Sequence, residues 1–283
     1  MSITVAKYAG FCFGVARAVK LLDKALESGK KTYCIGEMIH NPVFNADAKK
    51  RGLITIDEND LSCIDENSVV IIRSHGIDRQ IEQKLRMLNC EVIDATCPDV
   101  KKIHKIISEN TDTDSLLIMI GDKAHPEVRG SVSYSNGKYE VFKNFSEFEA
   151  NLNINLISQI KNVIMVAQTT HSVSDYEKCK EFIKKVYTNA KIFDTICSVT
   201  ESRQQEADRL SKICDVVYVV GGKSSSNTLK LYDICRNNCK NTYFAENADE
   251  VKAEDSELNI GIVAGASTPS GLIEEVTNKC QKN

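Results

Sequence analysis

The chain has 283 residues, of which 42% are hydrophobic, 27% charged and 6% aromatic, which is typical of a globular protein of about two domains. Its formal net charge of -3, from 36 basic and 39 acidic residues, includes no basic segment that would favour binding to nucleic acid. The apolar runs are about five residues long, far short of the roughly 20 that cross a bilayer, and the N-terminus lacks the apolar stretch of a signal peptide, so we expect a cytoplasmic protein without a membrane partner.

Short apolar runs alternate with longer stretches of helical periodicity along the chain. In order, the runs are residues 3–9, 32–36, 69–76, 92–93, 116–121, 163–172, 192–193, 216–221 and 260–271. Continuous runs of this kind indicate parallel strands covered on both faces by helices. Three of the runs (69–76, 163–172 and 260–271) end in small polar residues. Because sites in parallel sheets lie beyond the carboxyl ends of strands, we expect the functional residues there.

One pattern recurs three times. A cysteine follows a strand-like run, a glycine stands 24 residues later, and a polar residue stands four residues after that glycine. The three sets are Cys12, Gly36 and His40; Cys97, Gly121 and His125; and Cys197, Gly221 and Ser225. The sequence therefore predicts an α/β fold of three pseudo-threefold-related lobes, each a small, mainly parallel sheet flanked by helices, around a central site. The expected bounds are 14–96, 97–195, and 196–283 completed by the N-terminal strand in 1–13.

The cysteines at these strand ends are candidate ligands of a metal centre. Pro98 suits the first turn of a helix and Ser198 with Glu201 fits a capping box, so helices should follow Cys97 and Cys197, and helix N-termini stabilise thiolates. Structural zinc sites and electron-transfer iron–sulfur clusters take four ligands, whereas three cysteines would leave one iron of a four-iron cluster open to substrate. Alternatively, Cys235 or Cys239 supplies a fourth ligand, but no counterpart exists in the other repeats. These two and the remaining cysteines are interpreted as packing residues: Cys34, Cys63, Cys90, Cys179, Cys214 and Cys280.

The strand-end polar residues form a set of hydroxyls, amides and imidazoles that suits a phosphate or diphosphate. They are His40, His75, His125, Gln168, Thr169, Ser225, Ser226, Asn227 and Ser267. The segment GGKSSSNT is not a P-loop, because Val217 stands where that motif requires its first glycine. Glu127, in GDKAHPEVRG, is the acid of these loops; alone it is equally consistent with a solvated carboxylate, and beside an open metal position it is the expected proton source.

Taken together, the motifs resemble those of the LytB-type 4-hydroxy-3-methylbut-2-enyl diphosphate reductases, over essentially the whole chain. They are GFCFGVARAV, GEMIHNP, RSHG, DATCP, GDKAHPEVRG, AQTTHS, DTIC followed by Thr200, SSSNT and GASTP. The resemblance implies a [4Fe-4S] cluster at the centre of the three lobes, held by Cys12, Cys97 and Cys197 with one iron open. It also implies that the substrate diphosphate is bound by His40, His75, His125, Ser225, Ser226, Asn227 and Ser267. His171 has no role that the family pattern assigns.

The reaction implied by the resemblance is the reductive dehydroxylation of the allylic diphosphate to isopentenyl and dimethylallyl diphosphates. Glu127 would deliver protons, with Thr169 and the substrate's diphosphate assisting. No G-x-G-x-x-G nicotinamide fingerprint is present, so a ferredoxin or flavodoxin is the expected electron donor. Two alternatives rank lower: a zinc hydrolase with three cysteines and a histidine as ligands, and a non-enzymatic phosphoanion sensor whose cluster reports redox state.

Overall fold

A computed structural model describes residues 2–157, 160–252 and 258–282 of the chain. Its contacts divide the chain into two compact units. Unit 1 comprises Met1–Arg17, Ile39–Arg51 and Ser198–Asn283, and unit 2 comprises Ala18–Met38 and Gly52–Cys197. The bounds expected for three lobes remain a prediction, although each repeat does form a sheet of its own.

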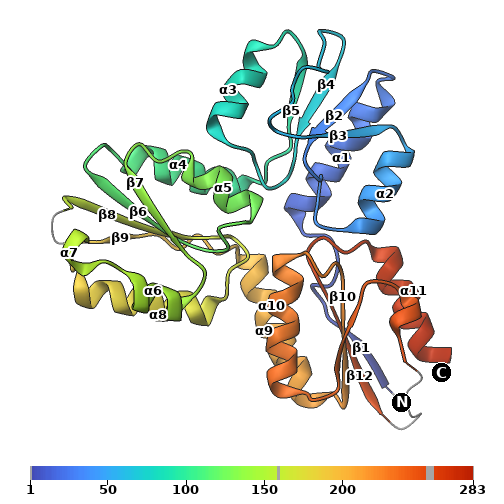
Figure 1. Ribbon diagram of the computed structural model, residues 1–283. Helices are drawn as coiled ribbons and strands as arrows, with labels where there is room; N and C mark the ends of the chain where they lie inside the picture. Colours follow the sequence, from blue (N-terminus) through green and yellow to red (C-terminus); the bar gives the residue numbers. More distant parts are fainter. Residues whose placement is uncertain (1, 158–159, 253–257, 283) are drawn as a thin grey trace. The chain divides into compact units, whose positions relative to one another are not determined.

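Three four-stranded sheets, each parallel throughout, carry the fold (Figure 1). Unit 2 contains the sheets of order β3-β2-β4-β5 and β7-β6-β8-β9, and unit 1 contains β1-β12-β10-β11. The strands are β1 (Ser2–Val5), β2 (Thr32–Ile35), β3 (Leu53–Ile56), β4 (Val69–Ile72), β5 (Glu91–Asp94), β6 (Ser115–Ile120), β7 (Lys138–Phe142), β8 (Asn162–Ala167), β9 (Lys191–Ile192), β10 (Val216–Val220), β11 (Thr242–Ala245) and β12 (Asn259–Ala264).

The predicted α/β class and parallel sheets are confirmed, and so is the use of the N-terminal strand: β1 pairs with β12 as β5 pairs with β4 and β9 with β8. The sequence analysis missed the edge strands β3, β7 and β11. Each of them has partly exposed positions that carry polar or aromatic residues, so none forms the continuous apolar run by which the central strands were found.

Helices cover both faces of the sheets. Their bounds are α1 (Phe13–Glu27), α2 (Pro42–Lys50), α3 (Arg79–Met87), α4 (Pro98–Asn110), α5 (Pro126–Val132), α6 (Phe145–Asn151), α7 (Ile154–Ile157), α8 (Val173–Val186), α9 (Ser198–Ile213), α10 (Ser226–Asn238), η1 (Ala248–Glu250) and α11 (Ser270–Lys282). In the β7-β6-β8-β9 sheet, α4 and α5 pack on one face and α6 and α8 on the other (Figure 1). In unit 1, α9 and α10 cover one face and α11 the other. None of these helices has the length and hydropathy that a bilayer crossing requires.

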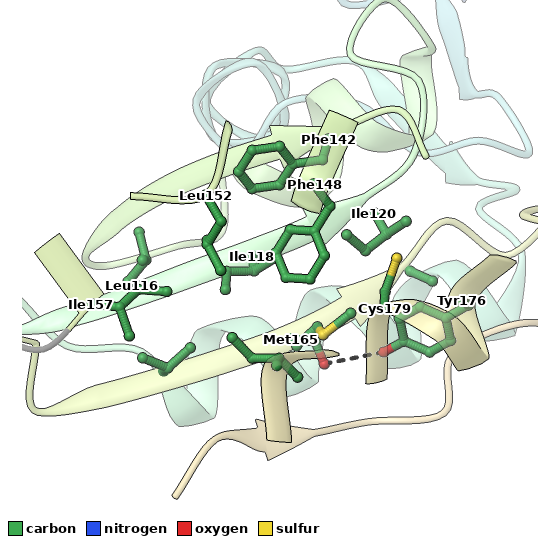
Figure 2. Packing of buried hydrophobic residues seen from close by; sticks show 13 residues of the cluster. Leu116, Ile118, Ile120, Phe142, Phe148, Leu152, Ile157, Met165, Tyr176 and Cys179 are labelled. Carbon is green, nitrogen blue, oxygen red and sulfur yellow. Dashed lines mark hydrogen bonds between the residues drawn. The ribbon is translucent and has the colours of Figure 1, made fainter. Parts of the chain in front are cut away.

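Aromatic side chains fill the layer between β6, β8 and helices α6 and α8 (Figure 2). Phe148 of α6 is fully buried, and its ring lies 5.1 Å from that of Phe142. Tyr176 of α8 is also buried, and its hydroxyl donates to the carbonyl oxygens of Phe193 at 2.8 Å and Met165 at 3.4 Å. This layer fixes the sheet in which β6 precedes the α5 helix of Glu127 and β8 precedes Thr169.

Truncation of Phe148 tests that layer. We expect Phe148→Ala to lower the free energy of unfolding by about 3–5 kcal/mol, because it removes transfer free energy and leaves a cavity. Met87→Ala, at an 82% exposed position, should change the free energy of unfolding by less than about 0.5 kcal/mol. Urea denaturation followed by circular dichroism measures both, and equal losses for the two variants would contradict this assignment of the core.

Candidate active site

The three cysteines of the repeat each stand immediately before a helix: Cys12 before α1, Cys97 before α4 and Cys197 before α9. Pro98 is the first residue of α4, as predicted, whereas α9 begins at Ser198, so that Cys197 takes the position that the capping-box hypothesis gave to Ser198. The Cys12 sulfur accepts a hydrogen bond from the Val15 N–H at 3.5 Å. All three thiols are partly exposed. Free N–H groups at a helix start favour a thiolate or the sulfur of an anionic cluster.

A second feature shared by these cysteines is a backbone hydrogen bond. The Cys12 N–H donates to the Ala266 carbonyl at 3.2 Å. The Cys97 N–H donates to Ser74 at 2.9 Å, and the Cys197 N–H donates to Thr169 at 3.0 Å. Each acceptor is the second residue after the neighbouring strand, in the small polar segments that end the apolar runs. The sheet itself therefore places each cysteine.

The remaining cysteines are mostly packing residues, as predicted. Cys34, Cys179, Cys235, Cys239 and Cys280 are buried. Burial raises the pKa of Cys34, Cys179 and Cys235 to about 12, which keeps these thiols protonated. Cys235 and Cys239 lie in the core under α9 and α10. Cys63 is exposed, so the packing interpretation is wrong for that residue.

Glu127 is the most strongly perturbed acid near these segments. It lies in the first turn of α5 and is 2% exposed. Thr169 holds both carboxylate oxygens, with its N–H donating to Oε1 at 2.6 Å and its hydroxyl to Oε2 at 2.7 Å. Burial raises the pKa of Glu127 to about 7, although the two hydrogen bonds from Thr169 oppose that shift. Near neutral pH the carboxyl group therefore exists in both protonation states, as a proton donor requires.

Unit 2 also brings together two of the predicted phosphate-binding histidines. The His75 and His125 rings lie edge to face with centroids 5.3 Å apart. Nδ1 of His125 accepts the Glu127 N–H at 3.1 Å and so caps α5. The same imidazole is thus oriented by the helix that carries Glu127. This contact links a candidate binding residue to the candidate proton donor.

Unit 1 holds the other candidates. The Ser267 hydroxyl donates to the His40 carbonyl at 3.0 Å, and Ser225 caps α10 through Thr228. Asn227 is 4% exposed, and neither Oδ1 nor Nδ2 has a hydrogen-bond partner among the described residues. A buried amide without partners costs free energy that a polar ligand would recover. Asn227 is therefore the strongest structural indication of a ligand in unit 1.

Comparison with known proteins was decisive. The model of the LytB protein family matches residues 3–281. The chain belongs to the LytB family.

Several members of this family are close relatives. The chain is 42% identical to the 4-hydroxy-3-methylbut-2-enyl diphosphate reductase of Thermoanaerobacter sp. (strain X514), an alignment that covers 99% of this chain and 96% of that protein. It is 41% identical to the reductase of that name from Campylobacter hominis, in an alignment that covers 99% of this chain and 98% of that protein.

Two solved structures are also similar. One, of (E)-4-hydroxy-3-methyl-but-2-enyl diphosphate reductase, the terminal enzyme of the non-mevalonate pathway, matches with a TM-score of 0.71 at 36% identity over both whole chains. The other, the E-1-hydroxy-2-methyl-but-2-enyl-4-diphosphate reductase from Plasmodium falciparum, has a TM-score of 0.85 at 27% identity, covering 98% of this chain and 87% of that one.

Two residues that hold the Cys12 segment escaped the sequence analysis of this LytB-family chain. Arg203 of α9 is 4% exposed, and its guanidinium donates to the carbonyls of Gly10 at 2.6 Å and Ala264 at 2.8 Å. Glu206, one turn further on, accepts the N–H groups of Lys7 at 2.8 Å and Tyr8 at 3.0 Å. No local pattern reveals such anchors, because their partners are backbone groups between 61 and 199 residues away in the sequence.

His171, which the family pattern left unassigned, is a structural residue. Its Nε2 lies 3.0 Å from Oδ2 of Asp175, and the same oxygen accepts the Phe145 N–H at 3.0 Å. The backbone N–H of His171 donates to the Gln168 carbonyl at 2.9 Å. His171 therefore ties the turn that contains Thr169 to α6 and α8.

The protonation of Glu127 is directly measurable. We expect an infrared carboxylic-acid band that titrates with a midpoint near pH 7, present below that pH and lost above it. Thr169→Val removes the hydroxyl that stabilises the ionised form, so the midpoint should rise by about one pH unit. Glu127→Gln should delete the band. Glu140→Gln, which removes another carboxyl group whose pKa is raised by burial, should leave the band unchanged. A midpoint near pH 4 in the parent protein would contradict the assigned environment.

Proposed function

We propose that this chain reduces (E)-4-hydroxy-3-methylbut-2-enyl diphosphate, removing the allylic hydroxyl to give isopentenyl and dimethylallyl diphosphates as the last step of the methylerythritol phosphate route. The observation that carries the proposal is the buried Glu127 carboxyl, with a pKa of about 7 and both oxygens held by Thr169. It occurs in a chain that is 42% identical, over 99% of its length, to a reductase of that name.

The proposed cofactor is a [4Fe-4S] cluster bound by Cys12, Cys97 and Cys197. Their fit to an anionic cluster rests on three shared properties: a partly exposed thiol, a position directly before a helix, and a backbone N–H fixed by the sheet. Three ligands leave one iron open. When bound, the cluster supplies two electrons in succession and a Lewis-acidic iron that polarises the allylic C–O bond.

Glu127 performs the proton chemistry. The overall reaction consumes two electrons and two protons: one proton leaves with the hydroxyl as water, and the other adds to either end of the allyl group. The Glu127 carboxyl is the proposed source, because burial raises its pKa to about 7, so that a proton is available near neutral pH. Thr169 keeps the carboxyl in one orientation and, by stabilising its ionised form, makes it a stronger acid than burial alone would allow. The substrate's own diphosphate assists the proton transfer.

The proposed diphosphate ligands are neutral or weakly basic groups: His40, His75, His125, Ser225, Ser226, Asn227 and Ser267. Nδ2 of Asn227 and the hydroxyls donate to phosphate oxygens, and the histidines bind most tightly when protonated. For Asn227, the ligand replaces partners that the described part of the chain does not provide. The proposed electron donor is a ferredoxin or flavodoxin, since each delivers single electrons to a cluster.

Replacement of Glu127 tests the mechanism. Glu127→Gln should lower kcat by about 10²–10⁴-fold, the usual contribution of a general acid, while substrate affinity stays within a few fold. Anaerobic assays with a chemical reductant and chromatographic detection of the two products give both quantities. Glu140→Gln, which also removes a carboxylate with a raised pKa, is the matched control and should be fully active. Turnover by Glu127→Gln at the parent rate would exclude Glu127 as the donor.

Loss of one cysteine tests the cofactor. Cys97→Ser should purify with little cluster absorbance, because a hydroxyl is a poor ligand for iron. Cys63→Ser, at an exposed position outside the repeat, should keep the full absorbance of the parent. If Cys97→Ser retained an intact cluster, the assignment of the three ligands would be wrong.

A further inference from the structure

Two adjoining cavities in unit 2 have neither Glu127 nor Thr169 among their lining residues, although Pro126 and Val128 line the larger one. One has a volume of about 390 Å³ and the other about 220 Å³, and they share Glu58, Arg73 and Arg129 as lining residues. The smaller is formed by the residues that follow β2, β3 and β4, including Gly36, Asp57 and Arg73. In the strand order β3-β2-β4-β5, the chain runs from β2 to the edge strand β3 and then crosses back over β2 to β4, so the switch point lies between β2 and β4. Gly36 and Arg73, which follow these two strands, line the smaller cavity. Ligands of such sheets bind at this point.

Arg73 is the charged group at the centre of these cavities. It is 7% exposed, and its one hydrogen bond is from Nε to the Gly76 carbonyl at 3.3 Å. Within the described ranges, Nη1 and Nη2 of Arg73 donate no hydrogen bond, and no carboxylate oxygen lies within 4.0 Å of the guanidinium. Burial lowers the pKa of Arg73, as expected of a desolvated cation. The guanidinium has no counter-ion within 4.0 Å, and its terminal nitrogens keep contact with solvent, so an anion that enters the cavities can reach them.

In the other two repeats, the residue at the position of Arg73 is uncharged. Arg73 is the first residue after β4, as Gln168 is after β8 and Gly265 after β12. The Gln168 amide accepts the Asp122 N–H and donates to Thr170, both at 3.1 Å. At Gly265 an added Cβ would overlap the Thr228 hydroxyl, which occupies the space. A satisfied amide and a hydroxyl therefore fill the position that Arg73 fills in the first repeat.

Gly36 makes room for the guanidinium. A Cβ at Gly36 would overlap Nη1 of Arg73, and the glycine has a φ of +71°, which disfavours any larger residue. The corresponding glycines face neutral groups: Gly121 faces Gln168, and Gly221 faces Thr268. All three repeats therefore have a glycine at this position, and the glycine of the first repeat adjoins a cation.

The lining of the two cavities carries three cations (Arg73, Lys123 and Arg129) and three carboxylates (Asp57, Glu58 and Asp78), and each carboxylate already has a hydrogen-bond or ion-pair partner. Glu58 is paired with Arg129 at 2.7 Å, Asp78 accepts the Gln80 N–H at 2.7 Å, and Asp57 accepts the Asn59 N–H at 2.8 Å. Lys123, which lines the larger cavity, has no salt bridge to any described residue. Guanidinium groups bind phosphate oxygens in a bidentate manner.

We propose that the Arg73 cavities form a second anion site, distinct from the catalytic pocket, which binds a phosphate group that is free or carried by a small metabolite. Nη1 and Nη2 of Arg73 are its primary donors, with Lys123 and Arg129 at its entrance. Arg73 also closes the turn that carries His75, since Gly76 N–H donates to the Arg73 carbonyl at 3.1 Å. Occupation of the site therefore stiffens a turn used by the proposed reductase.

The test is a calorimetric titration of the full-length, cluster-containing protein with inorganic phosphate at constant ionic strength. Arg73→Gln, which introduces the side chain found at the equivalent place in the second repeat, should weaken phosphate binding by about tenfold or more. Arg129→Gln should weaken it by a smaller factor, and this exposed position keeps the test valid if Arg73→Gln does not fold. Arg209→Gln, at a 59% exposed guanidinium in unit 1, is the charge-matched control and should bind as the parent does.

Other outcomes overturn the proposal. Parent-like affinity in a folded Arg73→Gln would do so, as would the absence of phosphate binding at millimolar concentration. If Asn227→Ala alone abolished the binding, the phosphate would belong to the substrate pocket, and the proposed function would stand without a second site. Conversely, a parent protein that binds phosphate through Arg73 but does not reduce the allylic diphosphate would refute the function and leave the anion site. Tighter binding of glycerol 3-phosphate than of phosphate would identify the ligand as a metabolite.

Discussion

A backbone hydrogen bond from each repeat cysteine to the neighbouring strand-end turn is the constraint on which the site depends. It continues the parallel pairing of the sheet past the last strand residue: Ala95 N–H donates to Ile72, and Cys97 N–H then donates to Ser74. In the sheet of unit 1, the Ala6 N–H donates to Ile262 and the Cys12 N–H to Ala266, with the turn from Ala6 to Ala9 between these two hydrogen bonds. Because a shift of one residue in a strand reverses the direction of every side chain, the register of each sheet decides where its cysteine points.

The sheet that supplies this register also imposes unfavourable environments on a few polar groups. Glu127 is buried to the point that its pKa is about 7, and Asn227 is buried without partners in the described part of the chain. Both lie in the first turn of a helix that starts just after a strand-end loop. Folded chains tolerate such groups chiefly at functional sites, where a ligand or a proton transfer makes use of them.

Much of this organisation was predictable because it is periodic. The central strands are continuous apolar runs, and the 24-residue spacing from Cys12, Cys97 and Cys197 to a glycine marks three equivalent loops. Those signals located the sheets, the N-terminal strand in the last sheet, and the polar loops. The edge strands β3, β7 and β11 were missed because none of them forms such a run, whereas the opposite edge strands β1, β5 and β9 were located by the repeat.

Contacts between distant segments could not be predicted from the sequence. Thr169 was identified by resemblance, but its double hydrogen bond to Glu127 joins residues 42 positions apart. Arg203 and Glu206 carry no local mark of their bonds to the Cys12 segment. Arg73 follows a strand like many other polar residues, and only its burial, its unbonded terminal nitrogens and the cavities beside it distinguish it.

The central proposal is that Cys12, Cys97 and Cys197 are the ligands of a four-iron cluster with one open position. The most direct measurement is the content of iron and acid-labile sulfide per chain in protein purified without oxygen. The account predicts about four of each, or about three irons where the open iron has been lost. Zinc without sulfide would contradict it, because the three cysteines would then serve a different metal and the reductive chemistry would have no electron carrier.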